Sequence, residues 1–315
     1  MPNVAIIGAG LIGRAWAAIF ARAGWDVAVW EPVESQRTAA PGLIGAQLED
    51  MARYGLADDP KAATKRVRMA ASLTDAVQTA DFVQENGPEL LDAKRRLFAQ
   101  LDAAARPGVV LSSSTSAIVA SHFTEDLPGR DRCLVGHPVN PPHLVPVVEI
   151  CGAPWTSDAA KQRAREVYAS IGQVPITVKK EIDGFILNRL QAALLSEAFR
   201  LVQEGYVSPQ DLDHTVADGL GLRWSFMGPF ETIELNAPEG IADYCRRYGP
   251  FFRRTLENQP TLAVWEDANV QSVADAWGPT PTAENIAKKS RWRDQRLAKL
   301  AAHKRTEAKS KPGQA

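Results

Sequence analysis

The chain has 315 residues, of which 45% are hydrophobic and 23% charged, and its formal net charge is -1 at pH 7. This length favours two domains, and the balanced charge gives no general reason to expect nucleic acid or an anionic membrane as a partner. No apolar run reaches membrane-spanning length and Met1 stands directly before the first apolar segment, so we expect no membrane helix, no cleavable leader and a cytoplasmic protein.

The first element is an apolar segment at residues 4–8 that runs into the pattern Gly8-x-Gly10-x-x-Gly13 and then into an alanine-rich helical pattern. Gly8 permits a tight turn, Gly10 lets the backbone approach a pyrophosphate, and Gly13 allows the helix to pack closely on the sheet. The free N–H groups at the start of that helix would receive the diphosphate. The combination predicts a dinucleotide site.

A second strand at residues 26–31 ends in Glu31, 18 positions after Gly13. A carboxylate there would accept hydrogen bonds from the adenosine ribose, and it would repel the 2′-phosphate of NADP. Glu31 therefore favours NAD as the cofactor. The alternative is an ordinary strand, turn and helix in which Glu31 is a surface acid.

Further strand-like segments are separated mostly by helical patterns, which predicts a Rossmann-type, doubly wound and mostly parallel sheet over residues 1–183. From Gly184 onward the pattern is almost wholly helical, so we expect a second, all-α domain at 184–315 that contributes to substrate binding. Ser208 and Pro209 mark a helix start within it. The further strands are expected at 67–71, 81–84, 109–112, 132–136, 145–151 and 174–178.

Polar clusters fall where predicted strands end, which is where this fold places chemistry. His137 is the best candidate for the base that takes a hydroxyl proton, because the ordinary pKa of histidine lies near neutrality. Glu149, twelve residues later, could accept the other ring N–H and fix the tautomer. Ser116 and Asn188 could bond the reacting oxygen.

Each of these residues also has a purely structural interpretation. His137 stands beside prolines and could be a turn histidine with all its hydrogen bonds satisfied. The serine-rich run that ends at Ser116 could be a polar loop or a helix cap, and Asn188 could bond the backbone at a helix start. Residue type and position alone leave both interpretations open.

Taken together, the glycine pattern, Ser114-Thr115-Ser116, His137-Pro138-Val139-Asn140-Pro141 and Gly184-Phe185-Ile186-Leu187-Asn188 resemble the 3-hydroxyacyl-CoA dehydrogenase superfamily. The resemblance covers nearly the whole chain, and within the superfamily it is strongest to the branch that oxidises L-gulonate. It implies a catalytic His137 paired with Glu149, with Ser116 and Asn188 on the substrate. It also implies a homodimer formed through the helical domain. The NAD contacts that it implies are Leu11, Ile12, Glu31, Glu89, Lys94 and Asn140.

The substrate is expected to be a small 3-hydroxy acid. The segment at residues 34–53 carries only Arg37 and Arg53 as cations, which gives poor support for a clamp on the phosphates of CoA. Arg223 resembles an arginine shared by the gulonate and carnitine branches, and a guanidinium suits a substrate carboxylate; a structural ion pair is the alternative. L-gulonate or a related sugar acid is the first expectation, with L-carnitine, 3-hydroxybutyrate-like acids and 3-hydroxybutyryl-CoA as alternatives.

A non-enzymatic role, as a structural or NAD-sensing protein, is the competing class of function. Cys133, Cys151 and Cys245 are far apart and match no zinc or redox spacing, so we expect reduced thiols and no metal site. The end of the chain is basic, with ten Lys or Arg against three Asp or Glu from Thr282 onward. Trp292, Leu297 and Leu300 are spaced as on a helix, which predicts a terminal helix with a solvated basic face.

Overall fold

The computed structural model describes residues 1–307, which form two compact units. The first unit contains Met1–Leu187 together with the chain from Lys289 onward, and the second contains Asn188–Lys288. Among these residues, no helix is both long enough and apolar enough to cross a membrane.

The first unit is built on one eight-stranded sheet with the order β3-β2-β1-β4-β5-β6-β7-β8. Strands β1 to β6 pair in parallel, whereas β7 runs antiparallel to β6, and β8 is parallel to β7. The order reverses between β1 and β4, and in such sheets ligands bind beyond the carboxyl ends of the strands at that point. The strands are β1 (Asn3–Ile7), β2 (Asp26–Trp30), β3 (Val67–Met69), β4 (Phe82–Glu85), β5 (Leu111–Ser113), β6 (Cys133–Pro138), β7 (Val147–Gly152) and β8 (Val174–Val178).

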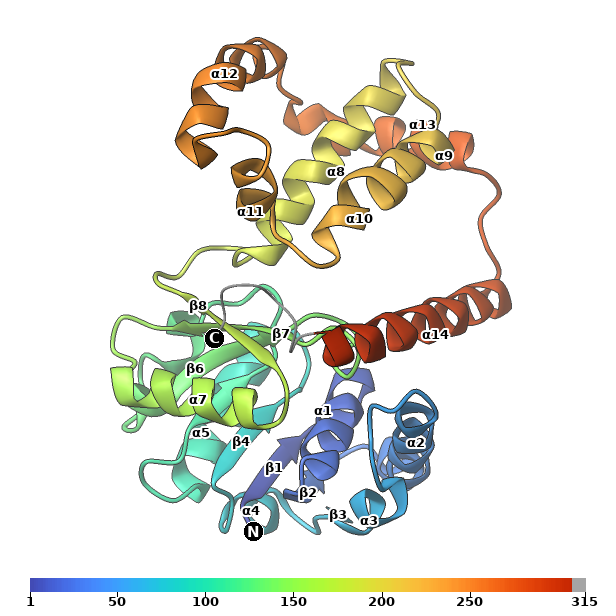
Figure 1. Cartoon of the computed structure of the whole chain (residues 1–315). Helices are drawn as coiled ribbons and strands as arrows, with labels where there is room; N and C mark the ends of the chain where they lie inside the picture. The colour runs from blue at the N-terminus through green and yellow to red at the C-terminus, as the bar shows by residue number, and fades with distance from the viewer. Residues whose placement is uncertain (308–315) are drawn as a thin grey trace. The chain divides into compact units, whose positions relative to one another are not determined.

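Both faces of the sheet are covered by helices, which explains why the last four residues of β1 are all apolar. Val4 and Ile6 belong to the core on one face, and Ala5 and Ile7 to the core on the other, because successive side chains of a strand point to opposite faces. Figure 1 shows α1 and α2 side by side, with α1 next to β1 and β2. The helices of this part are α1 (Leu11–Arg22), α2 (Glu34–Arg53), α3 (Pro60–Lys65), α4 (Leu73–Val77), α5 (Leu91–Ala104), α6 (Ser121–Thr124) and α7 (Asp158–Ser170).

The second unit contains helices and turns but no strand within its described residues. Its long first helix follows the Gly184 turn, and Ser208 caps the next one by accepting a hydrogen bond from the N–H of Asp211, with Pro209 at the first helical position as predicted. The helices are α8 (Leu187–Gln203), α9 (Pro209–His214), a π-helical turn (Thr215–Leu220), α10 (Gly221–Trp224), α11 (Pro229–Glu234), α12 (Gly240–Thr255) and α13 (Asp267–Trp277).

The last helix, α14 (Ala283–Glu307), differs from the expectation that all of 184–315 forms one helical domain. From Lys289 it belongs to the first unit, because Leu297 and Ala301 pack against the core that also contains Trp16 and Phe20 of α1. The terminal helix itself is present as predicted, and Trp292 is exposed on it. The part of the basic tail at residues 308–315 lies outside the described residues.

Candidate active site

Gly8 and Gly10 lie in the turn between β1 and α1, and Gly13 lies in the first turn of α1. Gly8 has φ +95°, and a Cβ there would lie 2.8 Å from the carbonyl oxygen of Asn86. A Cβ on Gly13 would lie 1.9 Å from the carbonyl oxygen of Gly8, so the helix could not pack so close to the strand with any larger residue. By contrast, a Cβ on Gly10 would meet no atom within 4 Å, so this backbone is open to a ligand.

Helix α1 begins at Leu11 with no side chain capping its N-terminus and no acid in its first turn. Its first N–H groups therefore remain available to an anion, and the helix dipole favours one there. This arrangement fits the diphosphate of a dinucleotide.

Glu31 lies directly after β2 and is held against this glycine turn. Its Oε2 accepts a hydrogen bond from the N–H of Ala9 at 2.7 Å, and its Oε1 accepts one from the N–H of Val33 at 2.9 Å. Each carboxylate oxygen can accept a further bond, so the same group can receive ribose hydroxyls. The residues present therefore fit NAD.

His137 and Glu149 form a buried pair. They are direct neighbours in the antiparallel register of β6 and β7, and His137 Nδ1 lies 2.8 Å from Glu149 Oε2. His137 is 5% exposed and Glu149 is fully buried. The sequence predicted this pairing, and the register of the two strands explains how residues twelve positions apart meet.

The other oxygen of Glu149 accepts two backbone hydrogen bonds at the start of α8. The N–H groups of Ile186 and Leu187 donate to Oε1 at 2.9 and 3.0 Å. Burial acts to raise the pKa of the Glu149 carboxyl, but the hydrogen bonds from His137 and from these two N–H groups outweigh it, so its pKa lies below the ordinary value. Glu149 is therefore ionised at neutral pH.

Phe185 was not identified as a site residue by sequence reasoning, yet it shapes this pair. It has φ +48°, which is unfavourable for a bulky side chain, and it follows Gly184 at φ +75°. Its fully buried ring packs on the imidazole of His137 with the ring centroids 5.4 Å apart. The same turn directs the N–H groups of Ile186 and Leu187 at Glu149. The only signal in the sequence was its place after Gly184 in the Gly-Phe-Ile-Leu-Asn motif.

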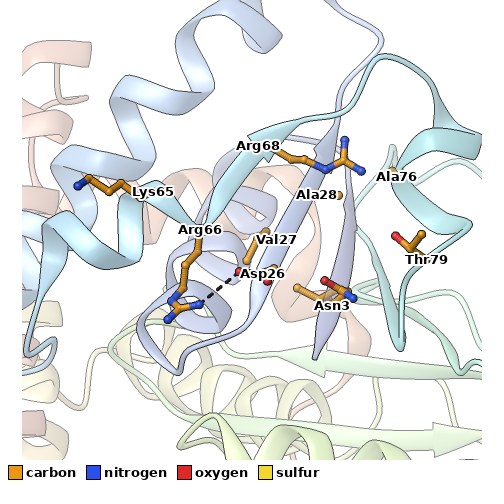
Figure 2. A pocket seen from close by; sticks show the side chains of 10 residues that line it. Asn3, Asp26, Val27, Ala28, Lys65, Arg66, Arg68, Ala76 and Thr79 are labelled. Carbon is orange, nitrogen blue, oxygen red and sulfur yellow. Dashed lines mark hydrogen bonds and ion pairs between the residues drawn. The ribbon is translucent and has the colours of Figure 1, made fainter. Parts of the chain in front are cut away.

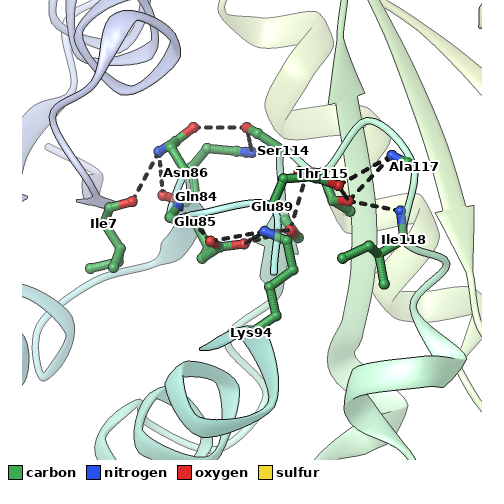
Figure 3. Close-up of polar contacts among 12 residues, drawn as sticks. Ile7, Gln84, Glu85, Asn86, Glu89, Lys94, Ser114, Thr115, Ala117 and Ile118 are labelled. Carbon is green, nitrogen blue, oxygen red and sulfur yellow. Dashed lines mark hydrogen bonds and ion pairs between the residues drawn. The ribbon is translucent and has the colours of Figure 1, made fainter. Parts of the chain in front are cut away.

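A second buried ion pair lies at the ends of β4 and β5 (Figure 3). The ammonium of Lys94 on α5 lies 3.0 and 3.2 Å from the two carboxylate oxygens of Glu85 and 3.3 Å from Ser113 Oγ. Lys94 is 1% exposed and Glu85 is fully buried. In this structure Lys94 thus holds the loop after β4, and its contact with NAD remains a prediction.

Glu89, another expected NAD residue, ties the same loop to the one that follows β5. Its carboxylate accepts hydrogen bonds from the hydroxyl of Thr115 and from the N–H of Ala117, which flank Ser116 (Figure 3). The contact therefore fixes the backbone on both sides of Ser116, whose own side chain is exposed.

A polar network that the sequence did not predict lies beneath the glycine turn. Ser114 Oγ accepts from Trp16 Nε1 at 3.0 Å and from Gln84 Nε2 at 2.8 Å, and it donates to Asn86 Oδ1 at 2.8 Å. The side-chain amide of Asn86 donates to the carbonyl oxygens of Gln84 at 3.0 Å and of Ile7 at 3.3 Å (Figure 3). Its main-chain N–H also donates to the carbonyl of Ile7, at 2.7 Å. The network holds Asn86 against Gly8, and its polar residues gave no periodic signal.

The remaining predicted residues lie in separate parts of the chain. Asn140 is exposed two residues after the end of β6, and Leu11 and Ile12 open α1. Asn188 is the second residue of α8, and Arg223 lies on α10; both belong to the second unit. Their assignment to the substrate remains a prediction.

Comparison with known proteins gives matches over most of the chain. The family model described as 3-hydroxyacyl-CoA dehydrogenase, NAD binding domain, matches residues 3–182, and that described as 3-hydroxyacyl-CoA dehydrogenase, C-terminal domain, matches residues 184–272. Lambda-crystallin of Oryctolagus cuniculus is 42% identical over 308 residues, which cover 96% of each chain. L-carnitine dehydrogenase of Pseudomonas aeruginosa is 38% identical over 311 residues, covering 98% of this chain and 96% of the relative.

The fold is also similar to solved structures. The structure of FHMPC 5-dehydrogenase, described as an NAD+-dependent dismutase, matches with a TM-score of 0.80 and 27% identity, covering 97% of this chain and 98% of the other. This similarity covers both units and supports NAD as the cofactor.

Proposed function

Because this chain belongs to the 3-hydroxyacyl-CoA dehydrogenase family, as its sequence motifs indicated, we propose that it oxidises the 3-hydroxyl group of L-gulonate or a related sugar acid to the 3-keto acid. The chain is an NAD-dependent oxidoreductase that acts on CH–OH groups. The observation that carries the proposal is the buried hydrogen bond between His137 and Glu149.

The pair supports a defined proton transfer. Because ionised Glu149 can only accept hydrogen bonds, Nδ1 of a neutral His137 must donate to it, and Nε2 is left as the basic nitrogen. His137 Nε2 accepts the proton of the 3-hydroxyl group, and Glu149 stabilises the imidazolium that results. NAD, when bound, supplies the acceptor for the hydride from C3. Ser116 and Asn188 hold the hydroxyl oxygen against His137 in this proposal.

A small acid rather than an acyl-CoA is favoured by the cations of α2. Arg53 pairs with Asp50 at 2.7 Å, and Arg37 donates to the carbonyl oxygen of Glu31 at 3.0 Å. Arg53 is thus paired with a carboxylate, whereas Arg37 keeps its charge while it donates to a neutral carbonyl. Within α2, Arg37 is left with no second unpaired cation beside it to meet the phosphates of CoA. Arg223 resembles an arginine shared by the gulonate and carnitine branches of the family, and it is the proposed partner of the substrate carboxylate.

L-carnitine is the second candidate substrate, and two observations favour it: a similar protein and two exposed aromatic side chains. The Pseudomonas aeruginosa L-carnitine dehydrogenase is 38% identical to this chain, and Trp224 and Phe226 next to Arg223 expose large parts of their rings. Aromatic faces bind quaternary ammonium groups. The two substrates share the 3-hydroxyl and the carboxylate and differ in the group beyond them.

A screen of NAD reduction with L-gulonate, L-carnitine, 3-hydroxybutyrate and 3-hydroxybutyryl-CoA distinguishes between these candidate substrates. We expect the highest kcat/KM with L-gulonate. Arg223→Met should lower kcat/KM for the small acids by roughly 10- to 100-fold, as loss of one hydrogen bond to a charged group implies, and change that for 3-hydroxybutyryl-CoA far less. Arg253→Met on α12, also exposed, is the matched control. A preference for the CoA ester that Arg223→Met leaves intact would overturn the small-acid assignment.

A further inference from the structure

Two of the cavities in the described part of the first unit lie outside the predicted active site, and they differ in whether carboxylates pair with the cations that line them. One, of about 340 Å³, lies at the amino ends of β1 and β2 and is lined by Lys65, Arg66 and Arg68 (Figure 2). There Arg66 pairs with Asp26 at 3.3 Å, and Arg68 pairs with Asp75 at 2.9 Å. Two of the three cations are thus neutralised by carboxylates of the same unit.

The other cavity, of about 390 Å³, lies where the end of α14 packs on α1 and on the turn that precedes β8, and we call it the α14 cavity. Figure 1 places the C-terminal end of α14 next to α1. Its apolar wall includes Leu144, Pro146, Leu297 and Leu300. None of the residues that line it is among the predicted catalytic or NAD residues.

The polar part of the α14 cavity is cationic. Arg22, Lys304 and Arg305 line it, and its described lining contains no carboxylate. Arg22 donates to the carbonyl oxygen of Leu56 at 3.1 Å, and Arg305 donates to that of Gly55 at 3.4 Å. These acceptors are neutral, so the bonds leave both positive charges in place.

The charges also act on one another. Burial first, and then the positive charge of Arg305, lower the pKa of Arg22 to about 10. An anion placed between the two guanidinium groups would therefore relieve a repulsion and accept hydrogen bonds from both. The nearest histidine does not add charge, because burial above all lowers the pKa of His143 to about 4, against the opposing fields of Asp294 and Asp50.

The side-chain amide of Gln173 is an independent observation that points to a polar ligand in this cavity. It lines the cavity and is 5% exposed, and neither its Nε2 nor its Oε1 has a hydrogen-bond partner among the described residues. A buried amide that lacks partners destabilises a fold by about 1–3 kcal/mol, so such groups are rare unless a ligand or water completes them.

We propose that the α14 cavity binds a small amphipathic carboxylate, with its carboxylate between Arg22 and Arg305 and its apolar body against Leu144, Leu297 and Leu300. The cavity falls in the size range of small-molecule sites, which combine apolar walls with a few polar groups that fix the orientation. A bound carboxylate would join α1 to α14 and so hold the end of the chain on the first unit. This site is independent of the oxidation of a hydroxy acid.

Titration calorimetry of the full-length protein with octanoate tests the proposal. We expect octanoate to bind, 1-octanol and inorganic phosphate each to bind at least tenfold more weakly, and Lys304→Met/Arg305→Met to lose at least tenfold in octanoate affinity. Lys289→Met/Lys299→Met removes the same charge from exposed positions of α14 outside the cavity and should bind octanoate as the wild type does.

Binding of octanoate in the active site is separated by a further variant. Arg223→Met should leave the octanoate affinity unchanged, because Arg223 belongs to the second unit and does not line the cavity. Unchanged affinity in Lys304→Met/Arg305→Met, or loss of binding in Arg223→Met, would overturn the proposed site. Neither outcome bears on the turnover of hydroxy acids, which the NAD reduction screen measures.

Discussion

His137 can act as a base only when its Nε2 carries no proton, and Glu149 determines this. Glu149 has three donors around its two oxygens, namely His137 Nδ1 and the N–H groups of Ile186 and Leu187. Every one of them favours the ionised carboxylate. The charge of Glu149 therefore sets both the orientation and the tautomer of His137.

Replacing Glu149 with Gln should preserve the shape of the site and abolish most of its activity. The amide oxygen can still accept from the backbone, but the amide NH2 would donate to Nδ1 and move the ring proton to Nε2. We expect kcat to fall by about 10³- to 10⁴-fold, as for a histidine held in the wrong tautomer, with little change in KM. Steady-state kinetics measure this, with the exposed Glu166→Gln on α7 as the control. A less than tenfold loss of kcat would mean that Glu149 does not set the tautomer.

The turn at Gly184 and Phe185 predicts an unusual order of stabilities. Loss of a buried Phe ring destabilises a protein by about 3–5 kcal/mol, and both Phe185→Ala and Phe185→Gly incur this loss. Only glycine adopts the positive φ of this residue without strain. Urea denaturation should therefore show Phe185→Gly to be more stable than Phe185→Ala by about 0.5–1 kcal/mol, and the reverse order would show that the turn relaxes in the variants.

At the scale of elements, the sequence predicted all eight strands, although it ended the sixth at residue 136, before His137, and that histidine lies within β6. It did not predict that β7 turns back antiparallel, because apolar segments look alike in either direction. That reversal is what places Glu149 opposite His137. Side chains whose role depends on one specific contact, such as Phe185 or Asn86, gave no periodic pattern to recognise.

A buried ion pair joins α5 to the sheet, beside the apolar contacts of Phe98 and Leu101. Lys94→Met would leave the carboxylate of Glu85 uncompensated and should destabilise the protein by about 3–5 kcal/mol. Adding Glu85→Gln to Lys94→Met should recover part of that loss, because the buried charge is then gone. Urea denaturation of the wild type, Lys94→Met, Glu85→Gln and the double variant gives the interaction free energy between the two side chains. If the double variant is as unstable as the sum of the two single ones, Lys94 and Glu85 are not coupled.

At the scale of the whole molecule, the predicted division at residue 183 resembles the start of the second unit at Asn188, but the sequence did not predict that the chain returns to the first unit. Local patterns identify α14 as a helix and do not specify which core receives Leu297 and Ala298. Whereas α14 packs apolar residues against the core of the first unit, α8 has no buried residue, and its apolar side chains Leu190, Leu194 and Leu195 are exposed. Exposed apolar side chains gathered in this way mark an interaction surface.

We therefore predict that the chain forms a homodimer through its second unit. Sedimentation velocity should give a mass of about twice 34.3 kDa, and Leu190→Lys on α8 should shift the protein to the monomer while the exposed Lys289→Met on α14 does not. A wild-type protein that sediments as a monomer at micromolar concentration would contradict the dimer.

The most direct test of the proposed oxidation is the loss of the base alone. His137→Gln keeps a donor for Glu149 but has no basic nitrogen, and His137→Ala removes both. With the preferred hydroxy acid, NADH formation should fall at least 10²-fold in both variants, while the Kd for NAD, measured by calorimetry, stays within about twofold of the wild type. Near-normal turnover in His137→Gln and His137→Ala would contradict the assignment of His137 as the base.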